Sequence, residues 1–208
     1  MSAFTKPPKS HLMTYRIGRG EQGVLTYEPY KSYLLPHWRF RTVQIARNSS
    51  DTLWNKFLEF YQQKDFVGMD MTRKFIQMGM TRSKRYANYK GGKKYVDGKE
   101  KGNMIQKSKG HNGREEKEEA SRIFREVWER CRSHGGYLEL KQEFLREQKE
   151  WLKAEDRVKL EEDQETEDHP KRRKNVRIKI ENEYGTQPPV SRQRIKTEHD
   201  WKRFIILV

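Results

Sequence analysis

Residues 65–78 read DFVGMDMTRKFIQM, and they carry the clearest helical pattern in the chain. Apolar side chains recur at intervals of four, four and three residues, which puts them on one face of a helix; they are Val67, Met71, Phe75 and Met78. Asp65 can cap the first turn, and the pattern continues through Tyr86 to a stop before Gly91. Basic and polar side chains fall largely on the other sides; they are Arg73, Lys74, Gln77, Arg82 and Lys84. The segment therefore predicts an amphipathic helix with a basic outer side.

Three further helices are predicted around this one. The first begins at Ser49-Ser50-Asp51, a run of three N-cap candidates, and has a broad apolar face formed by Leu53, Trp54, Phe57, Leu58, Phe60 and Tyr61. The second spans the apolar positions between Ile123 and Cys131, and His134-Gly135-Gly136 ends it. The third opens near Tyr137. Together with the helix at residues 65–78, these predict a four-helix domain.

Residues 1–48 lack such periodicity. Pro29 and Pro36 interrupt the segment, and residues 24–27 (VLTY) could form a short strand. The segment is rich in aromatic side chains, which can anchor it by burial. We expect an extended N-terminal arm packed across the helices.

The composition limits how much of the chain can fold. Only 33% of residues are apolar, against the roughly 45–50% typical of globular proteins, and 36% are charged. Aromatic and apolar periodicity fades after Leu152, where charge runs take over. The fold class expected is mainly α: a small four-helix domain at residues 11–152 with an extended N-terminal arm, followed by a disordered, charged C-terminal tail at residues 153–208.

The net charge of +15 is concentrated in the first half of the chain. Residues 1–110 hold 22 Lys and Arg against 8 Asp and Glu, which is +14. Within them, residues 73–109 hold 12 basic and 2 acidic side chains, which is +10. A field so concentrated attracts polyanions. From Lys90 to Gly113 the chain is rich in Gly and Lys, which predicts a mobile loop.

This charge makes nucleic acid the expected partner, DNA or RNA, bound through phosphates with low sequence specificity. The side chains expected to contact it are Arg73, Lys74, Arg82, Lys84, Arg85, Tyr86, Lys90, Lys93 and Lys94. Tyr86 could stack on unpaired bases or belong to the core. A charge run can also be no more than a solvated face, and no motif of a known nucleic-acid-binding fold accompanies this one.

Two other classes of function stay open. His37, Arg39, Asp70 and Arg73 could form a polar pocket for a small phosphorylated ligand, as in an enzyme or a sensor. The basic face could instead bind an acidic protein, as in an adaptor. A closed cleft would favour the small ligand, and a flat basic ridge would favour nucleic acid.

No residue pattern identifies a chemical reaction, so the sequence favours a protein that is not an enzyme, and no catalytic residue is assigned. Six histidines are scattered singly and Cys131 is the only cysteine, so we expect neither a metal site nor a cofactor. No apolar run approaches the length of a membrane span, and no secretory leader is recognisable, so a membrane is not an expected partner.

The tail contains one short basic run, Lys171, Arg172, Arg173 and Lys174, next to Pro170. Its composition is that of a nuclear import signal, so the import machinery is a further possible partner. We expect the protein in the nucleus, the cytoplasm or both.

Four stretches together resemble a known family. They are residues 18–25 (GRGEQGVL) with 28–32 (EPYKS), 35–40 (LPHWRF), 65–71 (DFVGMDM) and 82–92 (RSKRYANYKGG). They are similar to an uncharacterised domain-of-unknown-function family of small cytosolic proteins, over roughly residues 11–150. The resemblance implies a domain over those residues and no particular reaction.

Overall fold

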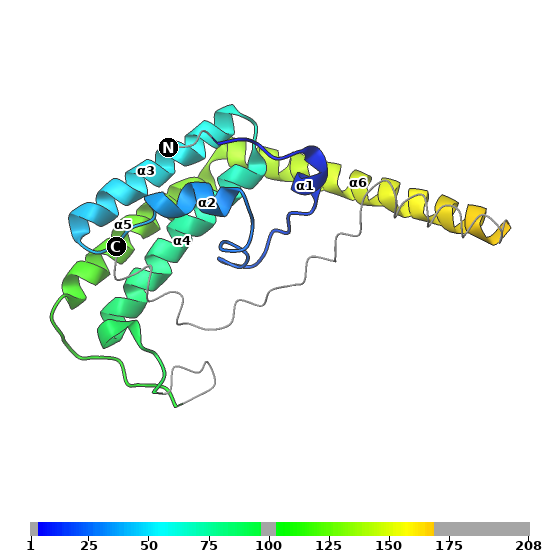
Figure 1. Ribbon diagram of the computed structural model, residues 1–208. Helices are drawn as coiled ribbons and strands as arrows, with labels where there is room; N and C mark the ends of the chain where they lie inside the picture. The colour runs from blue at the N-terminus through cyan, green and yellow to red at the C-terminus, as the bar shows by residue number, and fades with distance from the viewer. Residues whose placement is uncertain (1–3, 97–102, 169–208) are drawn as a thin grey trace. The chain divides into compact units, whose positions relative to one another are not determined.

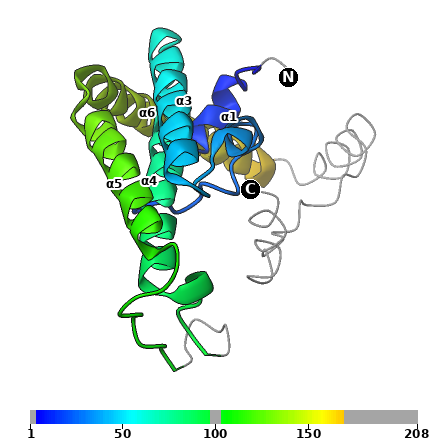
Figure 2. The same cartoon turned by 90° about the vertical axis from the view of Figure 1, so that its left-hand side faces the viewer.

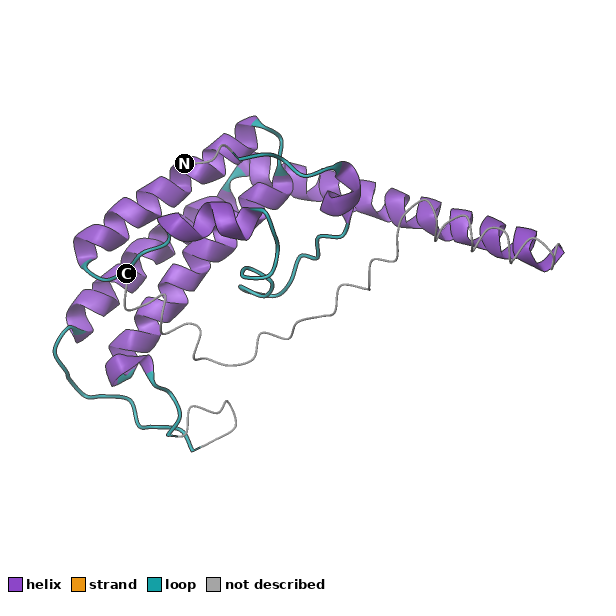
Figure 3. Cartoon of the chain, viewed as in Figure 1, coloured by secondary structure: helices purple, strands orange, loops and turns teal. Residues whose placement is uncertain are grey.

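A computed structural model of the chain describes residues 4–96 and 103–168, and these residues are mainly helical (Figures 1 and 3). The elements in chain order are α1 (Lys9–Met13), α2 (Tyr30–Leu34), the 3-10 helix η1 (Leu35–His37), α3 (Val43–Gln62), α4 (Phe66–Asn88), the 3-10 helix η2 (Lys90–Gly92), α5 (Arg114–Ser133) and α6 (Gly135–Asp168). One isolated antiparallel bridge is the only β-type pairing among the described residues. The predicted mainly α-helical class with a core of about four helices is confirmed.

The long helix α4 is the centre of the fold, because it packs against both α3 and α5, which also contact each other (Figure 1). Asp65 caps α4 as predicted: its Oδ1 accepts a 3.0 Å hydrogen bond from the Gly68 amide. Two glycines allow the close approach of its neighbours. A Cβ at Gly68 would lie 2.3 Å from the Phe60 ring of α3, and one at Gly79 would lie 2.6 Å from the Phe124 ring of α5.

The first turns of α6 complete this core. The ring centroid of Tyr137 lies 5.9 Å from that of Phe57 and 5.7 Å from that of Phe66. The ring centroid of Phe144 lies 5.0 Å from that of Phe66. Both α6 rings are buried. The predicted break before this helix is also present, since α5 ends at Ser133 and α6 begins at Gly135.

The helix α3 begins at Val43, not at Ser49 as the cap pattern predicted. Thr42 caps it, with Oγ1 accepting a 3.2 Å hydrogen bond from the Ile45 amide. The Ser49 hydroxyl has a different role: it accepts from the Arg39 amide at 2.9 Å and donates to the His37 carbonyl at 2.7 Å. The serine therefore ties the preceding segment to the side of the helix.

The N-terminal arm has more local structure than expected. The predicted strand at residues 24–27 is wrong: the amides of Val24 and Thr26 donate to the carbonyls of Glu21 and Gly23, which makes successive turns. The short helices α1 and α2 lie on either side of these turns in the sequence. Gly23 has a φ of +79°, and this left-handed conformation suits a turn better than a strand.

The chain divides into two compact units at Phe144, inside α6. The first contains the helical core. The described part of the second, residues 145–168, is the rest of α6, so the helix continues past the predicted domain boundary at residue 152. Residues 153–168 contain no Gly or Pro and are rich in Glu, which favours helix. The predicted tail beyond Asp168, including Lys171, Arg172, Arg173 and Lys174, lies outside the described residues.

Candidate nucleic-acid interface and the buried Asp70 network

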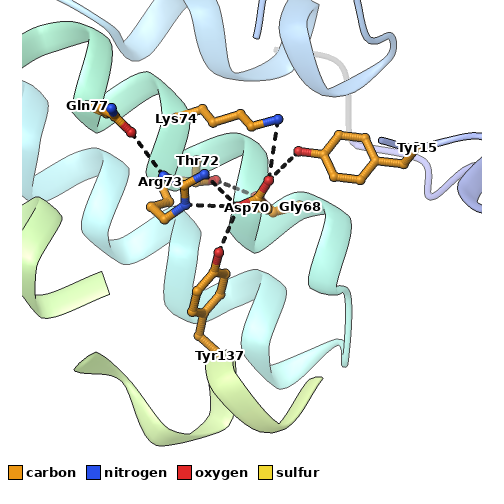
Figure 4. Close-up of polar contacts among 8 residues, drawn as sticks. All are labelled: Tyr15, Gly68, Asp70, Thr72, Arg73, Lys74, Gln77 and Tyr137. Atoms are coloured by element: carbon orange, nitrogen blue, oxygen red, sulfur yellow. Dashed lines mark hydrogen bonds and ion pairs between the residues drawn. The ribbon is translucent and has the colours of Figure 1, made fainter. Parts of the chain in front are cut away.

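Asp70, in the first half of α4, is fully buried, and both of its carboxylate oxygens are engaged (Figure 4). Oδ1 accepts hydrogen bonds from the Tyr137 hydroxyl at 2.7 Å and from Arg73 Nε at 2.8 Å. Oδ2 accepts from the Tyr15 hydroxyl at 2.5 Å and lies 3.5 Å from Lys74 Nζ. One carboxylate thus joins three parts of the fold: the arm, α4 and the start of α6.

The two cations of this network are also buried, Arg73 nearly so and Lys74 completely. A second nitrogen of the Arg73 guanidinium bonds within α4: Nη1 donates to Gln77 Oε1 at 3.0 Å. Nζ of Lys74 lies 4.8 Å from the centroid of the Tyr15 ring and, among the described residues, makes no hydrogen bond. The network therefore holds two cations and one carboxylate away from solvent.

Burial and charge act in opposite directions on these groups. Burial raises the pKa of Asp70, but the charges of Arg73 and Lys74 and the hydrogen bonds to the carboxylate together lower it more, so the net shift is downward. Burial lowers the pKa of Lys74, and the nearby Asp70 carboxylate opposes this without cancelling it. The pKa values of Tyr15 and Tyr137 are raised, first by burial and then by the Asp70 charge. At neutral pH both tyrosines are therefore protonated donors to an ionised carboxylate.

This burial corrects the placement predicted for two of the phosphate-binding residues. Arg73 and Lys74 were expected on a solvated basic side of the helix, and instead they lie in the interior. The physical reason is that no side of α4 is exposed to solvent over its first half. The N-terminal arm covers the side on which Arg73 and Lys74 lie. Tyr15 of that arm contacts both Asp70 and Lys74. Neither cation belongs to a surface.

The four residues predicted for a small-ligand pocket have separate interaction partners. Asp70 and Arg73 bond to each other and to neighbours in the core. The ring centroids of His37 and Tyr33 lie 6.1 Å apart. Arg39 Nη1 donates to the carbonyls of Leu35 and Trp38. Asp70 and Arg73 thus share one set of partners, while His37 and Arg39 contact other residues. Among the described residues, no interaction joins Asp70 or Arg73 to His37 or Arg39.

The tyrosines that complete the interior have no signal in the local sequence pattern. Tyr15 and Tyr137 bond to Asp70, and Tyr30 of α2 donates to Asp65 Oδ2 at 2.7 Å. The spacing of Asp70, Arg73, Lys74 and Gln77 at three, four and seven residues does mark a polar stripe along one side of a helix. It does not reveal that side chains far away in the sequence cover this stripe.

The other predicted residues gather where α4 ends. We define the basic end as residues 82–96 and 103–114, which contain nine Lys and Arg side chains and no Asp or Glu. The nine are Arg82, Lys84, Arg85, Lys90, Lys93, Lys94, Lys107, Lys109 and Arg114. In the turned view of Figure 2, the segment that follows α4 extends beyond the ends of α4 and α5.

Hydrogen bonds order much of this segment, which sequence analysis treated as a mobile loop. The Ser108 amide donates to the Asn88 carbonyl at 2.9 Å, and His111 Nε2 lies 3.1 Å from the Tyr86 carbonyl oxygen. Arg85 Nε donates to the Gly92 carbonyl at 2.7 Å. The returning half of the loop is therefore held against the last turns of α4.

The lysines of the basic end differ in their surroundings. Lys90, Lys93, Lys107 and Lys109 are exposed. Lys84 instead pairs with Glu118 of α5, across the interface between the two helices. These four lysines are thus the exposed cations of the basic end, and its other basic side chains are half-buried.

Tyr86, for which stacking on bases was one of two alternatives, is engaged within the fold. Its ring lies 5.8 Å from that of Phe40, edge to face. A Cβ at Gly92 would lie 2.7 Å from the same ring, so Gly92 allows the chain to fold closely over it. This packing favours the alternative in which Tyr86 stabilises the fold.

Within the described part of the chain, no three His, Cys, Asp or Glu side chains are grouped so as to hold a metal ion. Burial raises the pKa of the Cys131 thiol to about 12. Over the same residues, no helix combines the length and the apolar character needed to cross a membrane.

Residues 5–147 match the family described as Domain of unknown function (DUF4385). The match covers more than half of the chain, so the chain belongs to this family, which confirms the resemblance to an uncharacterised domain family. Comparison with curated proteins and with solved structures gives no significant match.

Proposed function

We propose that this protein is a non-catalytic nucleic-acid-binding protein that contacts phosphates through its basic end, with little sequence preference. The observation that carries the proposal is the charge of that segment: nine basic and no acidic side chains over the described residues 82–96 and 103–114, of which Lys84 is paired with a carboxylate, that of Glu118 on α5. Solubility does not require so one-sided a cluster, because a surface of mixed sign keeps a protein in solution. Polyanions are the partners that such a field attracts.

The local structure supports the same function. The exposed side chains Lys90, Lys93, Lys107 and Lys109 come from both halves of one folded loop, which hydrogen bonds hold to the end of α4. Lysines held on an ordered scaffold contact successive phosphates with less loss of conformational entropy than lysines on an unstructured chain. Nothing in this arrangement needs a particular base, so binding depends on the backbone of the nucleic acid.

The test is a salt titration of binding to a fluorescent DNA duplex of about two helical turns, an RNA duplex and the corresponding single strands. Changing Lys90, Lys93, Lys107 and Lys109 to Ala is expected to weaken binding. It should also make the slope of log K against log salt shallower by up to about 0.9 for each phosphate that is no longer neutralised. The matched control changes four exposed cations elsewhere to Ala, namely Arg125, Arg146, Lys149 and Lys153, and should keep the parent slope.

Equal binding by the parent and the four-lysine variant across the salt series would contradict the proposal and leave the basic end as a solvated face. Tighter binding of poly-glutamate than of any nucleic acid would favour the adaptor class instead. Circular dichroism of both variants controls for folding, since exposed charges each contribute within about 0.5 kcal/mol to stability.

Entry into the nucleus is part of this proposal. The supporting feature is the run Lys171 to Lys174, which has the composition of an import signal. A nuclear pool would bring the basic end to DNA and nascent RNA, and a cytoplasmic pool would bring it to RNA alone.

A further inference from the structure

Arg41, two residues before α3, is an exposed cation outside the basic end. Its guanidinium makes no hydrogen bond or ion pair with any described residue. Arg47, the next exposed cation along the chain, differs in this respect, because its Nη2 lies 3.2 Å from Glu119 Oε1 of α5. The charge of Arg41 is therefore not paired with a carboxylate of the described residues.

The backbone that carries Arg41 is held in place by α5. Lys117, in the first turn of that helix, donates from Nζ to the carbonyls of Phe40 at 2.7 Å and of Arg41 at 2.6 Å. The same ammonium lies 5.1 Å from the centroid of the Phe40 ring. The arginine side chain thus starts from a fixed position, which reduces the conformational entropy that it loses on binding a partner.

This position adjoins the basic end in space, although it is distant in sequence. The ring centroids of Phe40 and Tyr86 lie 5.8 Å apart, and the Tyr86 carbonyl oxygen lies 3.1 Å from His111 Nε2. Arg41 directly follows Phe40, and Lys109 precedes His111 by two residues. Tyr86 therefore links the segment of Arg41 to the segment of Lys109, and both of these cations are exposed.

The charges around Arg41 favour an anionic partner. Burial lowers the pKa of Lys117, the Glu116 carboxylate opposes this, and the nearby Arg41 guanidinium lowers the pKa further, so the two cations repel each other. A phosphate at Arg41 would relieve that repulsion. Glu115 and Glu116 are exposed in the same turn of α5, so this place offers one cation for contact and not a broad basic patch.

We infer that Arg41 contacts a phosphate of the same nucleic acid that the exposed lysines of the basic end bind. This inference rests on the proposed function and deepens it, because it adds a contact from a distant part of the chain and requires a partner with several phosphates. Arg41 and Lys109 lie on opposite sides of Tyr86, so a ligand with one phosphate group cannot contact both. A nucleic-acid backbone can, since its phosphates repeat at about 3.4 Å per strand along a duplex axis.

The experiment uses the full chain and the same fluorescent DNA duplex, with affinity measured across a salt series. Arg41→Ala should bind roughly fivefold more weakly at low salt, and its slope of log K against log salt should be shallower by about 0.9, because one phosphate is no longer neutralised. Arg41→Lys keeps the charge and should keep the parent slope. Arg125→Ala, which removes an exposed cation in the middle of α5, is the matched control and should also keep it.

A second measurement reports the position of the bound duplex. Arg41→Cys and Arg125→Cys each place one thiol on the surface, and the native Cys131 is fully buried, so a thiol-reactive photocrosslinker labels the introduced cysteine. On illumination at saturating protein, the label at position 41 should crosslink to the duplex and the label at position 125 should not.

A parent slope in Arg41→Ala, or a label at position 41 that does not crosslink to bound duplex, would overturn the inference. The proposed function would then still stand on the result for the four-lysine variant. A parent chain that binds no nucleic acid at all would overturn both. Thermal unfolding of each variant controls for folding, and no loss is expected from Arg41→Ala, because Lys117 bonds to the backbone of Arg41 and not to its side chain.

Discussion

The Tyr137 hydroxyl donates a 2.7 Å hydrogen bond to Oδ1 of Asp70, which joins the first turn of α6 to α4. The Tyr15 hydroxyl of the arm donates to Oδ2 of the same carboxylate, and Arg73 of α4 forms an ion pair with Oδ1. A buried carboxylate that accepts from three segments makes their positions depend on one another. A charged group that the sequence offered as one candidate for a ligand pocket thus links these segments inside the core.

The first prediction concerns the carboxylate itself. Asp70→Asn keeps the shape of the side chain but removes its charge, which leaves Arg73 and Lys74 buried without a counter-ion. Losing one partner of a buried ion pair costs about 3–5 kcal/mol, so the free energy of unfolding should fall by that order, as measured by urea denaturation. Asp51→Asn, at an exposed position on α3, is the control and should stay within ~0.5 kcal/mol of the parent.

The second prediction is a pH dependence of stability. The pKa of Asp70 is lower in the folded chain than in the unfolded one, so below about pH 4 the unfolded state takes up this proton first. The contribution of Asp70 to stability is therefore fully present above its unfolded pKa and is lost as the pH falls through its folded pKa. The free energy of unfolding, measured from neutral to strongly acidic pH, should decline less steeply in Asp70→Asn than in the parent; parallel curves would show that Asp70 has no part in the acid transition.

The third prediction separates the two buried cations. Lys74→Met replaces a buried ammonium that makes no hydrogen bond among the described residues with an apolar side chain of similar size, while Arg73 still neutralises Asp70. Stability should be unchanged or higher, because the buried Lys74 ammonium has a desolvation cost and Asp70 keeps Arg73 as its counter-ion. Arg73→Met removes the bonds to Asp70 and should cost about 3 kcal/mol or more. Equal losses in the two variants by thermal unfolding would show that Asp70 needs both cations.

The fourth prediction tests the packing of α4 against α5. Gly79→Ala places a Cβ 2.6 Å from the Phe124 ring, so we expect a loss of about 1–3 kcal/mol from overpacking. Gly135→Ala is the matched control, because its Cβ meets nothing within 4 Å, and it should stabilise the chain by about 0.4–1 kcal/mol. A stabilising Gly79→Ala, measured by urea denaturation, would mean that α5 can move away at little cost.

The fifth prediction concerns location in the cell. A tagged chain with Lys171, Arg172, Arg173 and Lys174 changed to Ala should lose its nuclear pool, because import receptors bind such runs by charge. A chain with Lys149, Lys153 and Arg157 changed to Ala removes cations from α6 and should keep the parent distribution by fluorescence microscopy. If both variants distribute like the parent, this basic run has no role in import.

Local patterns were enough to predict the four long helices, though not the short helices α1 and α2 of the arm. The intervals among Val67, Met71, Phe75 and Met78, the Asp65 cap and the break at residues 134–136 depend on neighbours within one or two turns, and all are present. The start of α3 was misplaced because Ser49 resembles a cap in sequence, whereas its hydroxyl bonds to Arg39 and His37 across ten and twelve residues. The charge of the basic end could also be counted directly from the sequence.

Whether Asp70, Arg73 and Lys74 are buried or exposed depends on tertiary contacts, which no local sequence pattern contains. Arg73 and Lys74 have the helical spacing of solvated cations, yet they are buried, because Tyr15 and Tyr137 reach Asp70 from positions 55 and 67 residues away. The antiparallel bridge between Tyr95 and Met104 likewise joins two parts of the chain that have no strand pattern of their own. Spacing along a chain reports which side of a helix a residue occupies, and burial depends on what the rest of the chain places against that side.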